Sequence, residues 1–159
     1  MDSPARILQA LNDERHIWND AYESVEVLSE FRSKNCVVQQ AKAKKVLGAT
    51  QREFLDKRIF FYKSEVKELE NGEDDDIFIW TSSAPNELCP EDKSRYVRAE
   101  TLFGLMRIGK LQNGGTYLHV VDQTDLKISA WTQKLLIPMA VPGLTDYRNK
   151  LNRHLLNTD

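Results

Sequence analysis

The feature that most constrains the fold is a long run of strand-like segments with no helix-length segment between them. These segments are rich in β-branched and aromatic residues, and turn-forming sequences separate them. Parallel strands need long crossover connections, usually helices, so neighbouring strands here must pair as an antiparallel meander. The expected strands are Val25–Phe31, Cys36–Leu47, Phe54–Lys67, Ile77–Ser82, Tyr96–Lys110 and Thr116–Asp122.

Three connections between these strands differ in their turn chemistry. Asn71-Gly72 and the acidic run Glu73–Asp76 predict a solvated turn. Asn113–Gly115 predicts a tight hairpin, because its residues tolerate positive φ. The segment 83–94 holds two prolines and several charges and is too long for a tight turn. Because loops of this length often cover binding sites, we expect a lid at residues 83–94.

Helical periodicity is confined to the two ends of the chain. Ser3-Pro4 predicts a capped helix start, and a second apolar spacing begins after Asn12-Asp13, so we expect two short helices with a tight break. Near the other end, two apolar stripes flank Pro142-Gly143, which predicts a long helix over residues 129–156 with a kink or restart at this pair. The predicted fold class is α+β, with a curved antiparallel sheet around the long C-terminal helix.

Length, charge and cysteine content narrow the class of protein. The 159 residues suffice for one domain with its own core, and the net charge is only −2. Nucleic-acid binders usually carry a basic excess, so we expect no nucleic-acid partner. Cys36 and Cys89 lie far apart without metal-ligand spacing, which predicts free thiols. With no secretory signal at the N-terminus, we expect a cytoplasmic protein.

The residues that could carry catalysis are sparse. His16, His119 and His154 share no metal-ligand spacing with one another or with the cysteines. His119 and Asp122 lie three apart on an expected strand, so they point to opposite faces and form no acid–base pair. The sequence contains no nucleophile elbow, P-loop or dinucleotide-binding glycine motif. We therefore predict that the protein is not an enzyme and uses neither a metal nor a cofactor.

The segment Arg52–Tyr62 carries the strongest indication of a ligand site. Strand alternation puts Asp56, Arg58, Phe60 and Tyr62 on one face, so charges are embedded in an apolar surface. Such a face suits a cavity in which a few polar groups orient a hydrophobic ligand. An exposed Asp56–Arg58 ion pair beside an ordinary core is the alternative. Arg52, at the strand entry, is expected to make structural hydrogen bonds.

Four segments together carry a resemblance to a known family: Thr50–Phe54, Tyr96–Glu100 with Gly104, Val121–Lys127 with Trp131, and Ser3–Trp18. The first two resemble starts of strands in START (StAR-related lipid transfer) domains. The third resembles the entry to the C-terminal helix of these domains, and the fourth resembles their two short helices. The resemblance covers nearly the whole chain in order. It implies a helix-grip fold with one lipid or sterol in an internal tunnel, closed by the C-terminal helix and the 83–94 lid.

The sequence also departs from the START pattern. START domains are longer, so we expect this chain to begin after their N-terminal helix and first strands. Glu53 stands where the family has Asp, and Ile128 and Ala130 replace a Gly and a Pro. Gln39 occupies the position of an acid that pairs with the cavity arginine, here Arg58, in some sterol-binding members. Asp56 would then have to neutralise this arginine, because a buried cation needs a partner.

The expected function is a non-enzymatic carrier of one phospholipid, fatty acid or sterol that meets membranes transiently as a peripheral protein. We expect Trp131 to lead an apolar stripe of the C-terminal helix and to pack against the sheet. The expected ligand-binding residues are Gln39, Asp56, Arg58, Phe60, Tyr62 and Arg98 on the sheet, and Trp131, Leu135 and Met139 on the helix.

Two other classes of function stay open. Without the first strands of the family, the strand Thr116–Asp122 would lack a partner on its outer side, and such an edge favours strand addition. The alternative is therefore a protein-interaction module that forms a homo-oligomer or domain swap and binds no lipid. A small-molecule enzyme of the wider helix-grip superfamily, such as a cyclase or hydrolase, is the third possibility.

Overall fold

The computed structural model describes residues 3–31, 35–45, 50–62 and 76–157, and for residues 31, 140 and 141 the backbone alone. Two short helices precede the sheet and one long helix follows it. The helices are α1 (Pro4–Asn12), α2 (Arg15–Trp18) and α3 (Ala130–Leu156), with a short 3₁₀ helix, η4 (Asn86–Leu88). The strands are β1 (Tyr22–Phe31), β2 (Cys36–Ala43), β3 (Gln51–Tyr62), β4 (Ile77–Ser83), β5 (Tyr96–Arg98), β6 (Glu100–Lys110) and β7 (Thr116–Asp125).

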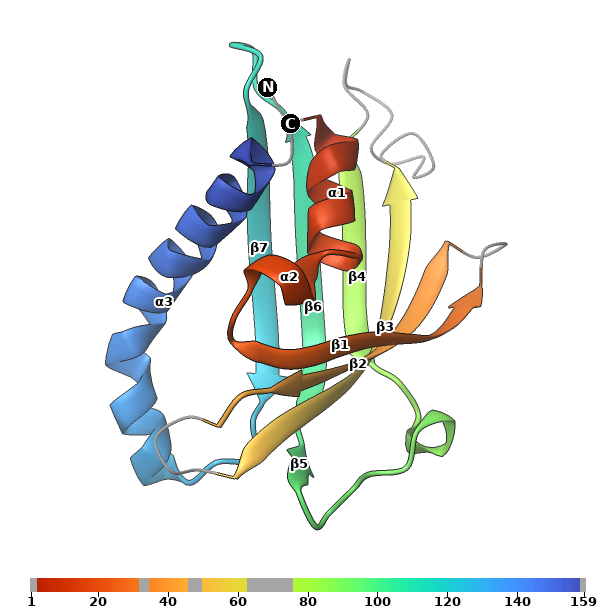
Figure 1. Cartoon of the computed structure of the whole chain (residues 1–159), viewed down its shortest axis with the longest axis vertical. Helices are drawn as coiled ribbons and strands as arrows, with labels where there is room; N and C mark the ends of the chain where they lie inside the picture. The colour runs from red at the N-terminus through yellow and green to blue at the C-terminus, as the bar shows by residue number, and fades with distance from the viewer. Residues whose placement is uncertain (1–2, 32–34, 46–49, 63–75, 158–159) are drawn as a thin grey trace.

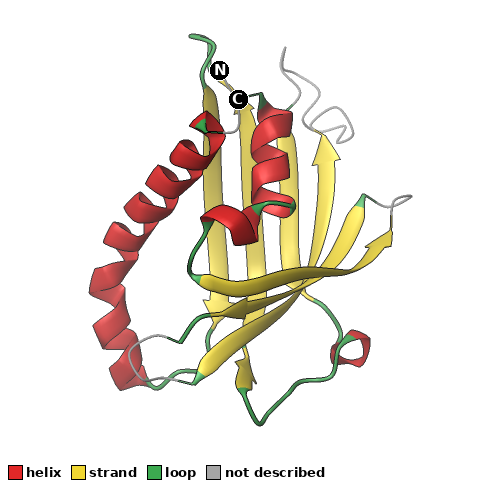
Figure 2. Cartoon of the chain, viewed as in Figure 1, coloured by secondary structure: helices red, strands yellow, loops and turns green. Residues whose placement is uncertain are grey.

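The strands form one curled sheet in the order β1-β2-β3-β4-β6-β7, and each neighbouring pair in this order is antiparallel. Figure 1 shows β1 running across the view while β4, β6 and β7 run along it, with α1 and α2 in front of the sheet and α3 beside it. Figure 2 shows the same single layer of strands with helices around it. The α+β helix-grip prediction is confirmed.

The predicted single strand Tyr96–Lys110 is wrong, because Ala99 divides it into β5 and β6. β5 pairs in parallel with the start of β3, whereas β6 pairs with β4 and β7. The amide of Ala99 donates to the carbonyl of Glu53 at 2.9 Å, and the residue is buried. One straight strand cannot follow both partners, so the chain bends here.

The β6–β7 turn follows the sequence prediction. Gly114 has a φ of 82°, and the amide of Leu111 donates to the carbonyl of Gly115 at 2.7 Å, which closes the β6–β7 hairpin. The turn at 71–75 lies outside the described residues, as do residues 46–47 and 63–67 of the expected strands. Asp76, predicted to be solvated, is instead buried and paired with Arg107.

The two N-terminal helices form as predicted and close one end of the sheet. The hydroxyl of Ser3 accepts a hydrogen bond from the amide of Arg6 at 3.2 Å, and Pro4 occupies the first turn. The indole of Trp18 donates to the carbonyl of Ala10 at 2.9 Å, which ties α2 to α1. The main core lies where these helices meet β4, β6 and the end of α3. Its largest fully buried aliphatic residues are Leu11, Ile79 and Ile108.

Helix α3 is anchored at its C-terminal end. Leu151 and Leu155 are buried against α1 and α2, and the ring of Tyr147 lies 5.0 Å from that of Trp18 in an edge-on contact. His154 Nε2 lies 2.5 Å from Glu14 Oε2, and Lys150 Nζ lies 2.6 Å from Asp20 Oδ1. The last turns of α3 are therefore part of the core.

The N-terminal half of α3 is exposed, and the prediction that Trp131 packs against the sheet is wrong. The side chain of Trp131 is 71% exposed, and Leu135 and Met139 are also exposed. The stripe that they form has the predicted spacing, but the helix diverges from the sheet in this half. Of the predicted kink or restart at Pro142-Gly143, the restart is absent: α3 continues through Pro138 and Pro142, and Figure 1 shows it as a bowed helix.

No helix of the described chain is both long enough and apolar enough to span a membrane.

Candidate functional site

A cavity of about 240 Å³ lies between the concave face of the sheet, α2 and α3. The strand register determines which side chains reach it, because directly paired residues lie on the same face of a sheet. Gln39 pairs with Asp56, Arg58 with Thr81, Thr81 with Gly104, and Gly104 with Asp122. The cavity lining includes the polar residues Arg15, Gln39, Asp56, Arg58, Thr81, Thr101, Asp122 and Thr124, and the apolar or aromatic residues Tyr22, Phe54, Met106, Val120, Leu144 and Tyr147. Leu105 and Val121 also border the cavity, although strand alternation directs their side chains to the other face of the sheet.

Gly104 keeps the middle of this surface open. A Cβ atom at this position would lie 3.1 Å from both Asp122 Oδ1 and Thr81 Cβ. These contacts are tight, so any side chain would displace one of the two polar residues. The glycine therefore leaves room for them to face the cavity.

Arg58 is the central charged group of the cavity. Its residue is only 1% exposed, and Nη1 donates to the carbonyl of Leu11 at 3.3 Å and to Asn12 Oδ1 at 3.0 Å. Burial, followed by the positive charge of Arg15, lowers the pKa of Arg58 to about 10. The guanidinium is still protonated at neutral pH. Its Nη2 has no hydrogen-bond partner among the described residues.

Three further polar atoms of the cavity lining lack a partner in the described part of the chain: Arg15 Nε, Gln39 Oε1 and Asp56 Oδ1. Burial raises the pKa of Asp56, with the hydrogen bond from Thr101 opposing this shift. An unsatisfied buried polar group costs about 1–3 kcal/mol. Two donors and two acceptors are thus available to a bound molecule, and the alternative of an exposed Asp56–Arg58 ion pair is wrong.

Arg15 and the residues around it were not predicted from the sequence. Arg15 Nη2 donates to the hydroxyl of Tyr22 at 2.7 Å, and its guanidinium lies 4.5 Å from the centre of that ring. Arg15 belongs to the four-residue helix α2 and reaches the cavity only because Trp18 holds that helix against the core. Tyr147 arrives from the far end of the chain. No local pattern marks either residue.

Phe60 and Tyr62, two of the predicted ligand residues, line a different cavity. It measures about 320 Å³ and lies between α1, β2 and β3, with Leu8 and Cys36 in its wall. The strand carries these side chains past the end of the polar cavity, toward α1. Their contact with a ligand remains a prediction, and so do the contacts of Trp131, Leu135 and Met139, which line neither cavity.

Arg98 also lies away from the polar cavity. Its Nη2 forms an ion pair with Glu53 Oε1 at 3.0 Å and donates to the carbonyl of Cys89, while Nη1 donates to Asn86 Oδ1 at 3.0 Å. These contacts anchor the segment 83–94. A ligand contact for Arg98 stays a prediction.

The segment 83–94 packs on the convex face of the sheet. Ala84 and Cys89 contact Val38 and Leu55, and Leu55 points away from its neighbours Phe54 and Asp56 in the cavity. The role of this segment as a lid therefore remains a prediction, and none of its residues lines the polar cavity.

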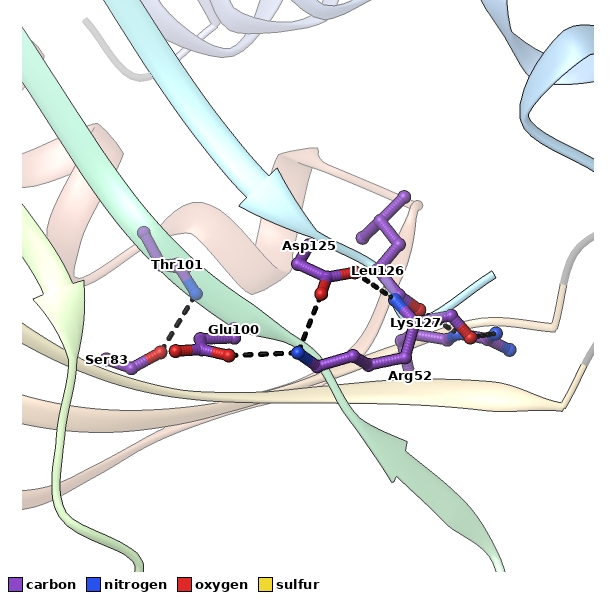
Figure 3. Close-up of polar contacts among 7 residues, drawn as sticks. All are labelled: Arg52, Ser83, Glu100, Thr101, Asp125, Leu126 and Lys127. Carbon is purple, nitrogen blue, oxygen red and sulfur yellow. Dashed lines mark hydrogen bonds and ion pairs between the residues drawn. The ribbon is translucent and has the colours of Figure 1, made fainter. Parts of the chain in front are cut away.

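The connection between β7 and α3 is fixed to the rim of the sheet, as Figure 3 shows. Arg52 Nε donates to the carbonyl of Leu126 at 2.9 Å, and its Nη2 donates to that of Lys127 at 3.1 Å. Lys127 Nζ pairs with Glu100 at 2.9 Å and with Asp125 at 2.6 Å. The predicted structural role of Arg52 is confirmed, since this side chain holds the start of α3.

A curled antiparallel sheet with a long C-terminal helix and an internal cavity defines the helix-grip class of proteins. The family model described as START domain matches residues 1–151, so the chain belongs to the START domain family. A search of curated proteins found no match.

Solved structures share this fold at low sequence identity. The human StarD13 (DLC2) lipid transfer and protein localization domain is 18% identical, with a TM-score of 0.70 over 93% of this chain and 71% of that one. Human StAR-related lipid transfer protein 5 is 15% identical, with a TM-score of 0.79 over 98% and 71%. A STAR-related lipid transfer protein fragment from Xanthomonas axonopodis is 16% identical, with a TM-score of 0.68 over 96% and 79%.

Proposed function

We propose that this chain is a non-enzymatic lipid-binding domain that holds one hydrophobic ligand, with the polar end of the ligand at Arg58 and Asp56. The observation that carries the proposal is the set of four buried polar atoms in one cavity that have no hydrogen-bond partner among the described residues. The names of the solved relatives refer to lipid transfer, which supports the same class of ligand.

The size of the cavity bears on how a lipid would sit. At about 240 Å³ it is smaller than the roughly 300–1,000 Å³ of common ligand sites. The polar end and the first carbons of a lipid fit inside, and the remaining chain leaves past Leu144 and Tyr147, which α3 adds to the wall. A phospholipid, a fatty acid and a sterol each offer oxygen atoms to the arginine donors.

Lipid extraction of the purified protein, followed by mass spectrometry, tests the proposal. We expect a stoichiometric lipid in the wild-type protein and a loss of most of it in Asp56→Leu, which removes an unpaired acceptor from the cavity. The Tm must be measured together with the lipid content, because Asp56→Leu also removes the acceptor of the hydrogen bond from Thr101 and a negative charge that favours protonated Arg58. Loss of lipid from a variant that keeps its fold supports the proposal. Arg58→Leu is a poorer test, since Arg58 also bonds to Leu11 and Asn12.

Glu26→Leu is the matched control, because it removes an exposed carboxylate from β1, which does not line the cavity at this position. The control should retain the lipid. A wild-type protein without lipid, or full lipid occupancy in Asp56→Leu, would contradict the proposal.

We also propose that the protein is cytoplasmic and exchanges its ligand at membrane surfaces. An apolar ligand has low solubility in water, so its transfer requires contact between the protein and a membrane.

Self-association through β7 is the second candidate function. Within the described chain, β7 pairs only with β6 and forms one end of the sheet, and Val121 at its centre is 60% exposed. An edge of this kind can pair with another strand. Sedimentation at low micromolar concentration should show a dimer if the edge is used in this way. A monomer whose β7 amides exchange rapidly with solvent would exclude it.

A further inference from the structure

The convex face of the sheet carries two rows of side chains that are mostly apolar or aromatic. Each row runs across β3, β4, β6 and β7, because its members are directly paired in the register. The cavity residues Arg58, Thr81 and Asp122 lie on the other face, one position away along each strand. The first row is Ile59, Trp80, Leu105 and Val121, and the second is Phe61, Phe78, Arg107 and His119.

Ring contacts join the side chains of this surface, which we call the outer aromatic face. Phe61 and Phe78 are stacked with ring centres 5.2 Å apart, and Phe103 meets Trp80 edge-on at 4.8 Å. Trp80 is nevertheless 39% exposed. Figure 1 shows the described helices α1 and α2 in front of the sheet, on its concave side, so these two helices do not cover the outer aromatic face. Val121 is 60% exposed, and the other apolar members of the two rows are half-buried. A contiguous, partly exposed apolar surface of this kind marks an interaction site.

The charged or titratable side chains of the two rows, Arg107 and His119, are of the basic residue types. His119 is exposed, as is Lys57, which lies two positions before Ile59 on the same face of β3, and the guanidinium of Arg107 lies 5.8 Å from the ring centre of Phe78. Asp76, which neutralises Arg107, is itself buried and lies 2.7 Å from Arg107 Nε. The two rows, all of whose members are described, contain no carboxylate, although the whole chain has a net charge of −2.

We propose that the outer aromatic face docks on a lipid membrane that contains anionic headgroups. Tryptophan and other amphipathic rings favour the membrane–water interface, and the cations at the face would meet phosphate groups there. A second copy of this chain fits less well, because an isologous contact would bring Lys57, Arg107 and His119 against the same residues and supply no carboxylate. The site is separate from the cavity and does not depend on which ligand the cavity holds.

Binding to vesicles tests the proposal with two exposed tryptophans on different parts of the molecule. We expect the full chain to sediment with vesicles of phosphatidylcholine and phosphatidylserine, and less with phosphatidylcholine alone. Trp80→Ser should weaken this binding roughly fivefold, which corresponds to about 1 kcal/mol. Val121→Ser, at a more exposed position of the same face, should weaken it without any risk to the core.

Trp131→Ser is the matched control, since Trp131 is exposed on α3. It should bind vesicles as the wild-type protein does, and in Trp131→Phe the fluorescence of Trp80 should shift to shorter wavelength when vesicles are added. The proposal is overturned if Trp131→Ser loses binding, if Trp80→Ser and Val121→Ser keep it, or if the wild-type protein binds no vesicles.

The same samples separate this proposal from that of a cavity ligand. Trp80→Ser should retain any lipid that co-purifies with the wild-type protein, because its side chain lies on the opposite face from Asp56. Vesicle binding that depends on Trp80 in a protein without bound lipid would leave this inference standing and would contradict the cavity proposal alone.

Discussion

The buried C-terminal end of α3 and the exposed part of the helix before it should contribute very differently to stability, and two leucines of the same helix measure this difference. Leu151 is 5% exposed and belongs to the core formed with α1, whereas Leu144 is 66% exposed. Both are replaced by alanine. This substitution changes the intrinsic helix propensity little, so the difference between the variants reports packing.

The expected magnitudes follow from burial. Truncating a buried leucine to alanine costs about 2–5 kcal/mol, since it removes apolar contacts and leaves a cavity. Leu144 buries only about a third of its side chain, and full burial of a leucine stabilises by about 1.5–3 kcal/mol, so its truncation should cost less than about 1 kcal/mol. We expect Leu151→Ala to lower the free energy of unfolding by at least twice as much as Leu144→Ala.

Urea denaturation followed by circular dichroism gives both values. The slope of the free energy against urea must be equal in the two variants for the comparison to hold. Trp131→Ala, at another exposed position of α3, should behave like Leu144→Ala. If Leu144→Ala or Trp131→Ala costs as much as Leu151→Ala, the part of α3 before Tyr147 is packed in solution and the cavity wall is different from that described.

Two further changes test contacts elsewhere in the fold. The hydrogen bond with His154, and then that from Arg6, hold the pKa of Glu14 below its usual value. The ionised carboxylate therefore stabilises the fold above its unfolded pKa of about 4.3. This stabilisation is lost as the pH falls through the lower pKa of the folded state. Glu14→Gln should therefore lower the Tm at pH 7, with a difference from the wild type that vanishes in acid; a constant difference would contradict the ion-pair explanation. At Gly109, an added Cβ would overlap Asp76 Oδ1 and lie 2.6 Å from the hydroxyl of Tyr117. Gly109→Ala should therefore lower the free energy of unfolding by about 1–3 kcal/mol, measured by urea denaturation. A neutral effect would show that Asp76 moves freely.

The sequence was sufficient to predict features that depend on local spacing. Strand alternation placed Asp56 and Arg58 on one face, and the cap at Ser3 located the first helix. Features that depend on distant partners could not be predicted. Ala99 interrupts the strand because the segment before it pairs with β3 and the segment after it pairs with β4. Nothing within Tyr96–Lys110 indicates these two partners.

The exposure of Trp131 illustrates the same limit more sharply. A helical stripe shows which face of a helix is apolar, but it does not show where along the helix a partner is present. In α3 the partner is present only near Tyr147 and Leu151, where Trp18 and α1 lie. Arg15 was missed for a related reason, because its position in the cavity is set by the packing of Trp18.

The strand register connects the two surfaces proposed here for lipid. In β3, Arg58 faces the cavity and Ile59 faces the outer aromatic face, and the same alternation holds for Trp80 and Thr81 in β4. A slip of one residue in a strand moves its side chains to the opposite face. A slip of β4 against β3 would therefore place the indole of Trp80 in the cavity beside Arg58 and remove it from the outer face, so both surfaces require the same pairing of β3 with β4.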